Sequence, residues 1–283
     1  ICATPIGNLE DITLRALRVL KEVDLIAAED TRRTRQLLTH FDIHTPLISY
    51  HRHNALSRIP DLIARMKSGL DIGVVSDAGT PGISDPGQKL IQAAIEEGIS
   101  VVPIPGPSAV ITALVASGYE TGVFVFGGFI PRSGRQKRQF MEKVAREYRT
   151  TVLYETPHRL LDTLRMCADV MPRRSIAVCR ELTKLHEEIL RGLPELLLEH
   201  FEETRPRGEF VLVFSAMQED EEMQPTVPND FTDRPIEEAV RYLLGQGYNK
   251  KSAIKMIARE RGIPRREVYK AAIDIPAVNT EEN

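Results

Sequence analysis

The chain has 283 residues, 42% of them hydrophobic, and a formal net charge of −3 at pH 7. This length allows two packed domains, and the small net charge excludes a protein that is a polycation throughout. The most apolar stretch, 101–118, is broken by three prolines and Gly106, so no transmembrane span is predicted. The three cysteines, Cys2, Cys167 and Cys179, lack metal-site spacing and fit reduced core thiols in a cytoplasmic protein.

Short apolar runs alternate with amphipathic stretches along the first 215 residues. The predicted strands are 1–4, 25–28, 72–76, 101–104, 123–127, 151–154, 176–179 and 210–214. The predicted helices are 13–21, 34–41, 55–67, 86–97, 136–148 and 158–170. Several strands are apolar throughout, which is typical of strands covered on both faces. The alternation predicts an α/β protein with largely parallel sheets, in two α/β domains at 1–117 and 118–216.

The last part of the chain changes composition twice. Residues 217–233 hold six acids, two prolines and no Lys or Arg, which predicts a solvated acidic linker. Residues 234–273 hold ten Lys or Arg against four Glu. They divide into three short helices, so 234–275 is predicted to be a basic three-helix domain with a helix-turn-helix-like joint at 261–264. This domain could dock on RNA or a protein, or cap the chain's own core.

The stretch VSDAGTPGISDPG, 75–87, follows an apolar strand and brings acids but no Lys or Arg. It lacks the lysine of a P-loop and the glycine spacing of a dinucleotide fingerprint, and its aspartates would repel phosphate. A ligand with a cationic or neutral polar face suits it better, and S-adenosylmethionine carries a sulfonium and no phosphate. The alternative is a tight surface turn. Similar loops follow other strands at 3–13, 104–109, 153–160 and 180–182, which favours one shared pocket.

The motifs ATPIGNLEDIT, AEDTRRT, VSDAGTPGISDPG, IPGPSA, YETPHRL and RELTK resemble those of the ribosomal RNA small subunit methyltransferase I family. That family lies within the tetrapyrrole-methylase-like superfamily, and the resemblance covers about residues 1–215. It implies two α/β domains with S-adenosylmethionine in the cleft between them, and a homodimer. It also implies 2′-O-methylation of the ribose of a cytidine in the decoding region of small-subunit (16S) ribosomal RNA, within the 30S subunit.

The family's cofactor contacts carry over where the motifs match. The resemblance implies that S-adenosylmethionine is bound by Pro5, Val75, Ser76, Asp77, Thr80, Ile83, Ser108, Ala109, Tyr154, Glu155, Leu182, Arg207 and Gly208. The loop after Asp77 is longer than in the tetrapyrrole branch, so the choice between Thr80 and Ile83 stays open.

A ribose hydroxyl is a weak nucleophile, so a general base or a strong hydrogen-bond acceptor should assist its attack on the methyl group. Acids and a histidine at predicted strand ends are candidates. Glu29 and Asp30 are taken together as the catalytic pair, with Glu155 and His158 as further candidates. The alternative for the AEDTRRT motif is a helix start with Asp30 or Thr31 as N-cap, and for His158 a residue of a helix start.

Two histidines, His51 and His53, flank Arg52 in a spacing that a strand could use for a metal. No third ligand is evident, and methyl transfer from S-adenosylmethionine needs no metal. A polar surface or an RNA contact is the preferred interpretation, and no metal is predicted.

RNA binding requires local positive charge. Residues 131–149 hold seven Lys or Arg against two Glu, and three arginines lie in the segment EDTRRTR, 29–35. The alternative for each group is a solvated helix face. The predicted RNA contacts are Arg32, Arg33, Arg35, Arg132, Arg135, Lys137 and Arg138.

Two rival functions remain open at this point. One is a small-molecule enzyme, a tetrapyrrole (precorrin-like) methylase, against which the basic segments argue. The other is a nucleic-acid-binding protein that senses S-adenosylmethionine without turnover. No membrane association is predicted in any of the three cases.

Overall fold

The computed structural model describes residues 1–217 and 234–275, so nearly all of the predicted linker 217–233 lies outside the described residues. The described residues form two compact units. The first unit comprises Ile1–Thr112 and Leu182–Lys184, and the second comprises Ala113–Glu181 and the described residues from Leu185 on. The predicted four-part division of the chain stays a prediction.

The first unit is built on a parallel sheet with strand order β2-β1-β3. The strands are β1 (Leu25–Ala28), β2 (Leu47–Ser49) and β3 (Ile72–Val75). Its helices are α1 (Leu14–Glu22), α2 (Thr31–His40), α3 (Ala55–Lys67) and α4 (Gly87–Glu96), after a short 3-10 turn, η1 (Leu9–Asp11). This unit confirms the predicted parallel sheet.

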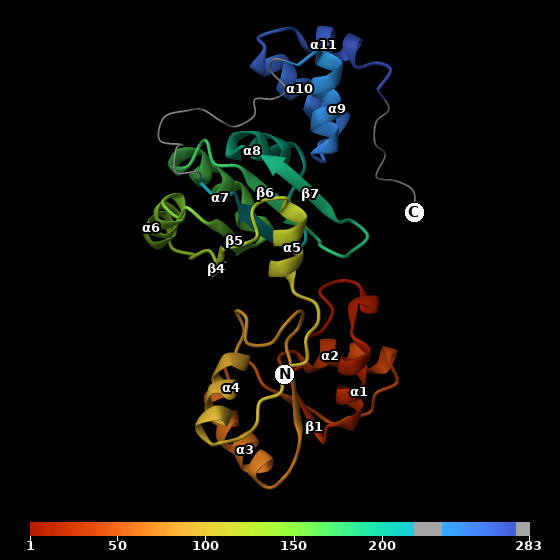
Figure 1. Cartoon of the computed structure of the whole chain (residues 1–283), viewed down its shortest axis with the longest axis vertical. Helices are drawn as coiled ribbons and strands as arrows, with labels where there is room; N and C mark the ends of the chain where they lie inside the picture. Colours follow the sequence, from red (N-terminus) through yellow and green to blue (C-terminus); the bar gives the residue numbers. More distant parts are fainter. Residues whose placement is uncertain (218–233, 276–283) are drawn as a thin grey trace. The chain divides into compact units, whose positions relative to one another are not determined.

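Alternating side chains of β1 pack on opposite faces of this sheet. Ile26 and Ala28 belong to an apolar cluster with α1 and α2, whereas Leu25 and Ala27 belong to one with α3 and α4. Helices thus cover both faces (Figure 1), which explains why β1 is apolar at every position. Coverage of both faces leaves the loops at the carboxyl ends of the strands as the exposed polar edge.

Two predicted strands of the first unit are shorter than expected. Residues 1–4 and 101–104 form only single bridges, Cys2 with Ile104 and Thr4 with Gly79. Prolines follow or interrupt both segments and supply no N–H to a ladder. The segments nevertheless lie beside β3, because Cys2 N donates to Val74 O at 2.9 Å.

The second unit has a five-stranded mixed sheet with order β4-β5-β8-β6-β7. Its strands are β4 (Phe124–Phe129), β5 (Thr150–Glu155), β6 (Ile176–Arg180), β7 (Glu188–Gly192) and β8 (Phe210–Phe214). Only β4 and β5 pair in parallel, whereas β8 runs antiparallel to both β5 and β6. The prediction of largely parallel sheets is wrong here, because the last strand inserts antiparallel at the centre, where an apolar run gives no sign of direction.

Helices α6 (Gly134–Ala145), α7 (Pro157–Val170) and α8 (Pro194–Glu203) share one apolar core with this sheet. The two units join within α5 (Ala109–Ser117), an apolar helix that the alternation pattern did not predict. Strands β2 and β7 were also missed, since β2 has three residues and β7 is an edge strand with charged positions.

The C-terminal helices α9 (Ile236–Gly245), α10 (Lys250–Glu260) and α11 (Arg265–Ala271) follow the predicted three-helix pattern. Their apolar faces belong to the same buried cluster as the second unit's core, including Val240, Leu243 and Tyr248. Tyr248 Oη donates to Arg191 O at 3.1 Å, at the end of β7. The described helices therefore pack against their own α/β unit.

Candidate functional site

In a parallel sheet the carboxyl ends of all strands meet at one edge, and ligands of such sheets bind beyond that edge. In the first unit three loops begin there: Glu29–Asp30 after β1, the segment 50–54 after β2, and the loop 76–87 after β3. Tyr50 N donates to Ala28 O at 2.8 Å, which holds the second loop beside the first. The short strand β2 thus adds a loop that the sequence did not place in the site.

The loop 76–87 is closed by one of its own carboxylates. Asp85 Oδ1 accepts hydrogen bonds from Gly82 N at 2.8 Å and from Gly87 N at 2.7 Å. Gly79 and Gly82 adopt positive φ angles of 79° and 94°, which glycine allows at little energetic cost. The loop is therefore a preorganised structure whose shape depends on Asp85 and its glycines.

Two further predicted segments meet this loop. Thr4 N donates to Gly79 O at 2.9 Å and Gly79 N donates to Thr4 O at 3.0 Å. Thr80 Oγ1 donates to Pro107 O at 3.2 Å. These contacts bring the neighbours of Pro5 and Ser108 to the same place as Thr80, as expected for one pocket in this unit.

Acidic groups gather between the first and third loops. Asp30 N donates to Asp77 Oδ1 at 2.9 Å, and Asp77 Oδ2 lies 3.6 Å from Arg33 Nη1. Burial raises the pKa of Glu29 above its usual range, and the charges of Asp77 and Asp85 raise it further. Arg52, from the loop after β2, acts in the opposite direction.

The two predicted catalytic acids differ in their surroundings. Asp30 is the N-cap of α2: its Oδ1 accepts from Arg32 N at 2.8 Å, and its carboxylate also pairs with the Arg32 side chain. Hydrogen bonds from Arg32 lower the pKa of Asp30 to about 2. The N-cap interpretation is confirmed, so Asp30 is already occupied as an acceptor and Glu29 is the better candidate base.

The chemistry of this edge fits S-adenosylmethionine. Glu29, Asp77 and Asp85 place carboxylates where a phosphate would be repelled, whereas a sulfonium would be favoured. The side chains of Val75 and Ser76 are buried, so these two residues could meet a cofactor only through their main chain. Ala109 begins α5, and Ile83 is exposed on the loop.

A segment distant in sequence also joins the first unit. Leu182 is buried, and Asn8 N donates to Thr183 Oγ1 at 3.1 Å. A Cβ atom added at Gly7 would overlap Leu182 O and the side chains of Thr183 and Lys184, so the two segments approach closely. The structure therefore places Leu182 beside the turn that carries Pro5.

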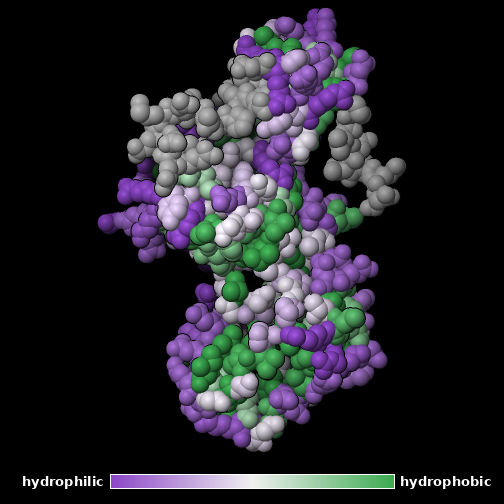
Figure 2. Space-filling model, in the orientation of Figure 1, coloured by the Kyte–Doolittle hydropathy of each residue, from purple (hydrophilic) through white to green (hydrophobic). Residues whose placement is uncertain are grey.

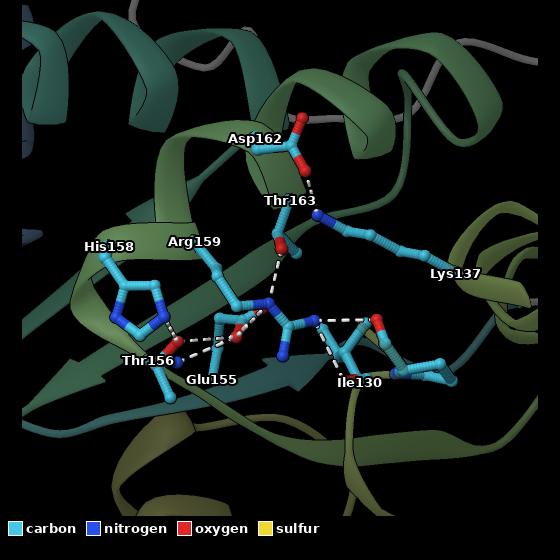
Figure 3. A network of polar contacts seen from close by, with 9 residues as sticks. Ile130, Lys137, Glu155, Thr156, His158, Arg159, Asp162 and Thr163 are labelled. Carbon is cyan, nitrogen blue, oxygen red and sulfur yellow. Dashed lines mark hydrogen bonds and ion pairs between the residues drawn. The ribbon is translucent and has the colours of Figure 1, made fainter. Parts of the chain in front are cut away.

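In the second unit, β5 ends at a buried carboxylate (Figure 3). Glu155 accepts hydrogen bonds from Thr156 N at 2.7 Å and Thr163 Oγ1 at 2.5 Å, and Arg159 Nε lies 3.6 Å away. Its side chain is committed to this network, so the predicted cofactor contact of Glu155 can apply only to its main chain. Tyr154 packs between Phe126 and Phe129, with ring centroids 5.1 Å apart in each pair.

The same network fixes the loop after β4. Arg159 Nη2 donates to Ile130 O and Pro131 O, both at 2.8 Å. His158 Nε2 lies 3.4 Å from Thr156 Oγ1 at the start of α7, as its helix-start interpretation expects. Arg159 and Thr163 were not predicted as important residues, although both follow the YET motif at helical spacing.

The other predicted cofactor pair, Arg207 and Gly208, lies in the exposed turn before β8. Arg180 Nε donates to Arg207 O at 2.9 Å. Gly208 has a φ of 86°, and a Cβ atom there would overlap the Glu181 carboxylate. This turn requires glycine on both counts.

The predicted RNA-binding side chains divide into two groups. In α2, Arg32 and Arg33 are 89% and 65% exposed, and Arg32 and Arg35 line an open hollow of about 740 Å³ with Thr39 and His40. In and before α6, Arg132 and Arg135 are exposed.

Lys137 departs from the prediction. Its side chain is buried and its Nζ pairs with Asp162 (Figure 3), so it is not free to meet RNA. Arg138 is half exposed but pairs with both Glu142 and Asp169. Sequence charge alone cannot separate these committed cations from the exposed ones, because two of the pairing partners, Asp162 and Asp169, lie on α7.

The described residues contain neither a metal-binding cluster nor a membrane-spanning helix. Within residues 1–217 and 234–275, no group of three or more His, Cys, Asp or Glu could hold a metal ion. His51 and His53 have ring centroids 6.0 Å apart. No helix in the same ranges is long and apolar enough to cross a membrane.

Comparison with known proteins agrees with this fold. The tetrapyrrole (corrin/porphyrin) methylase family matches residues 1–197. A diphthine synthase structure has a TM-score of 0.59 at 15% identity, covering 76% of this chain and 88% of its own. A uroporphyrin-III C-methyltransferase from Thermus thermophilus, complexed with S-adenyl homocysteine, has a TM-score of 0.55 at 15% identity, covering 76% and 95%. The fold and site thus define a methyltransferase of the tetrapyrrole-methylase class.

Relatives that match over nearly the whole chain identify a narrower family. "Ribosomal RNA small subunit methyltransferase I" of Synechocystis sp. is 45% identical over 98% of both chains. The protein of that name from Halalkalibacterium halodurans is 46% identical over 95% of this chain and 92% of its own, and that of Bacillus subtilis 43% over 95% and 91%. The chain belongs to the ribosomal RNA small subunit methyltransferase I family. It is an S-adenosylmethionine-dependent methyltransferase.

Proposed function

We propose that this enzyme methylates the ribose 2′-hydroxyl of a cytidine in the decoding region of small-subunit ribosomal RNA. The observation that carries the proposal is the edge of the first unit's sheet, where a preorganised acidic loop lies beside the arginine-bearing helix α2. An acidic loop suits a sulfonium, and adjacent exposed arginines suit a phosphodiester backbone. A small-molecule methylase explains the loop but leaves the arginines without a role.

The residues at this edge have distinct roles in the proposal. S-adenosylmethionine supplies an electrophilic methyl group, and the main chain of the loop 76–87 with the turns at Pro5 and Ser108 would hold it. Glu29 is the proton acceptor for the ribose hydroxyl, because burial raises its pKa above the usual range while its side chain remains partly accessible beside α2 and the loop 76–87. Asp30 and Asp77 position α2 and the loop against each other.

We also propose the form of the RNA substrate, the cellular location and the oligomeric state. The substrate is the RNA within the 30S subunit, and the location is the cytoplasm, which follows from a ribosomal substrate. A homodimer is proposed from exposed apolar side chains: Ile111 and Val115, one turn apart on α5, are 50% and 68% exposed. Sedimentation of the wild type and of Val115→Glu would test this, and a wild-type monomer would contradict it.

The cofactor assignment is tested by Asp77→Arg. This change places a cation in the acidic loop, so we expect calorimetric binding of S-adenosylmethionine to be lost. Asp61→Arg is the matched control, because it changes charge equally on the surface of α3, where Asp61 pairs with Arg65. Unchanged affinity in Asp77→Arg would contradict the assignment of this loop.

The substrate is tested by tritium transfer from labelled S-adenosylmethionine to 30S subunits, free small-subunit RNA and a porphyrinogen in parallel. We expect label on 30S RNA, in a nuclease-resistant dinucleotide that marks a 2′-O-methyl group. Label on the porphyrinogen alone would favour the small-molecule methylase, and cofactor binding without transfer to any of the three would favour a sensor.

A further inference from the structure

A basic groove lies on the C-terminal helices, and none of the residues predicted to bind cofactor or RNA lines it. It has a volume of about 510 Å³ and an open mouth. Five cationic side chains and a single carboxylate, Glu203 of α8, line it. The lining residues are Glu203, Lys250, Lys251, Ile254, Lys255, Arg265, Arg266 and Tyr269.

The packing of α10 and α11 explains why the cations face outward. Ile254, Ile257 and Val268 are buried in the core that these helices share with the second unit. Helical periodicity then puts the lysines and arginines of both helices on the opposite faces, where they converge. Figure 2 shows hydrophilic residues over much of the three C-terminal helices on the face in view.

Part of this positive charge is used within the chain. Lys255 Nζ pairs with Glu203 Oε1 at 2.8 Å, and Lys250 Nζ donates to Ile273 O at 3.3 Å and Ile275 O at 2.5 Å. The hydrogen bond from Lys255 lowers the pKa of Glu203, and the charges of Lys255, Lys251 and Arg265 lower it further. The carboxylate is thus ionised and already neutralised by Lys255.

The remaining cations are exposed. Lys251, Arg265 and Arg266 have exposed side chains. Within the described residues none of these three side chains forms a hydrogen bond or an ion pair, although the charges of Lys251 and Arg265 act on Glu203. Tyr269, beside them, is 56% exposed and offers an aromatic face. Three unengaged cations next to an exposed aromatic ring match a chain of phosphates with unstacked bases.

We propose that this groove between α10 and α11 binds a phosphodiester segment of the substrate RNA, with Lys251, Arg265 and Arg266 on the phosphates and Tyr269 against a base. The groove is a second anchor, separate from the arginines of α2. The inference rests on the proposed function, since it assumes that the substrate is RNA.

The test compares two full-length double variants. Lys251→Gln with Arg266→Gln removes two groove cations, and Arg241→Gln with Lys270→Gln removes two exposed cations outside the groove. Binding of a fluorescent small-subunit RNA fragment is measured by anisotropy over a salt series. We expect the groove variant to bind roughly tenfold more weakly and its log–log salt slope to fall by about 2, with the control close to wild type.

Other results of these binding measurements would overturn the proposal. Equal losses in the two variants would mean a diffuse charge effect and would overturn the groove. A variant that loses affinity for 30S subunits but not for the naked fragment would overturn RNA as the occupant and point to a ribosomal protein. Calorimetric affinity for S-adenosylmethionine serves as a folding check, since neither variant changes a residue of the first unit's loops. If wild type neither binds nor methylates RNA, the proposed function itself fails.

Discussion

At the scale of single residues, the acids of the first unit show how similar side chains acquire different roles. Asp85 holds a loop closed, Asp30 caps a helix, and Glu29 is left partly buried beside both aspartates of the loop. The sequence placed these acids at strand ends, because apolar strands followed by polar loops are easy to recognise. It could not assign their roles, which depend on which backbone N–H groups each carboxylate meets.

The raised pKa of Glu29 predicts a pH-dependent effect on stability. Such a carboxyl group stabilises the fold while it is protonated, and this stability is lost as pH rises through its folded-state pKa. We therefore expect Glu29→Gln to raise Tm at pH 7, with the difference vanishing below about pH 4. Methyl transfer at pH 7 should fall about 100-fold if Glu29 accepts the proton. A higher Tm with full activity would leave Glu29 without a catalytic role.

The buried carboxylate of Glu155 predicts a structural effect of a different size. Glu155→Ala removes the acceptor for Thr163 and the partner of Arg159. Loss of one partner of a buried ion pair costs about 3 kcal/mol, so we expect that decrease in the free energy of unfolding in urea. Thr163→Val removes only one hydrogen bond and should cost about 1 kcal/mol. Equal effects of the two changes would show that the ion pair adds nothing.

At the scale of elements, the loop 76–87 is the part of the site that the sequence described best. Its glycines and prolines predicted a tight turn, and its acids predicted a non-phosphate ligand. The sequence predicted that the loops carrying Thr4 and Pro107 share its pocket, but the individual hydrogen bonds were not predictable, because they join segments about 70 and 27 residues away. The loop after β2 was missed for a related reason: three residues of strand are too few to produce a periodic pattern.

Gly79→Ala tests the preorganisation of this loop. The added Cβ would have ordinary contacts, the nearest being Ile6 Cγ2 at 3.5 Å, so the change acts through the φ angle of 79°. An alanine at positive φ costs about 1 kcal/mol, and we expect S-adenosylmethionine affinity to fall with stability. Gly134→Ala in α6 is the control, because nothing lies within 4 Å of its added Cβ and its φ is not positive. Calorimetry and thermal unfolding measure both effects, and a neutral Gly79→Ala would contradict them.

At the scale of the whole molecule, local sequence patterns predicted the positions of many strands and helices well but predicted their pairing poorly. β1 and β8 occupy the predicted residues, yet the antiparallel insertion of β8 between β5 and β6 was unexpected. Strand direction depends on long-range topology and leaves no trace in local periodicity. The three-helix tail was located correctly by composition, whereas its packing against β7 and α8 became visible only in the structure.

That packing changes what a truncation would do. Removal of residues 234–283 would expose the apolar surface that Val240, Leu243 and Tyr248 cover, and it would remove the hydrogen bond to Arg191 O. We expect the truncated protein to unfold at a lower temperature in its second unit, so its loss of RNA methylation would not isolate RNA binding. Differential scanning calorimetry measures this, and an unchanged Tm would show that the tail is energetically independent.

The position of β8 also has a consequence for biosynthesis. The strand that occupies the centre of the second sheet is the last of the five to be made, so β5 and β6 lack their common neighbour until Phe214 has been translated. The parallel sheet of the first unit, by contrast, is complete at Val75. A nascent chain halted near residue 205 would carry a complete first sheet and an incomplete second one. The edges of β5 and β6 that pair with β8 would then be unpaired and accessible to chaperones.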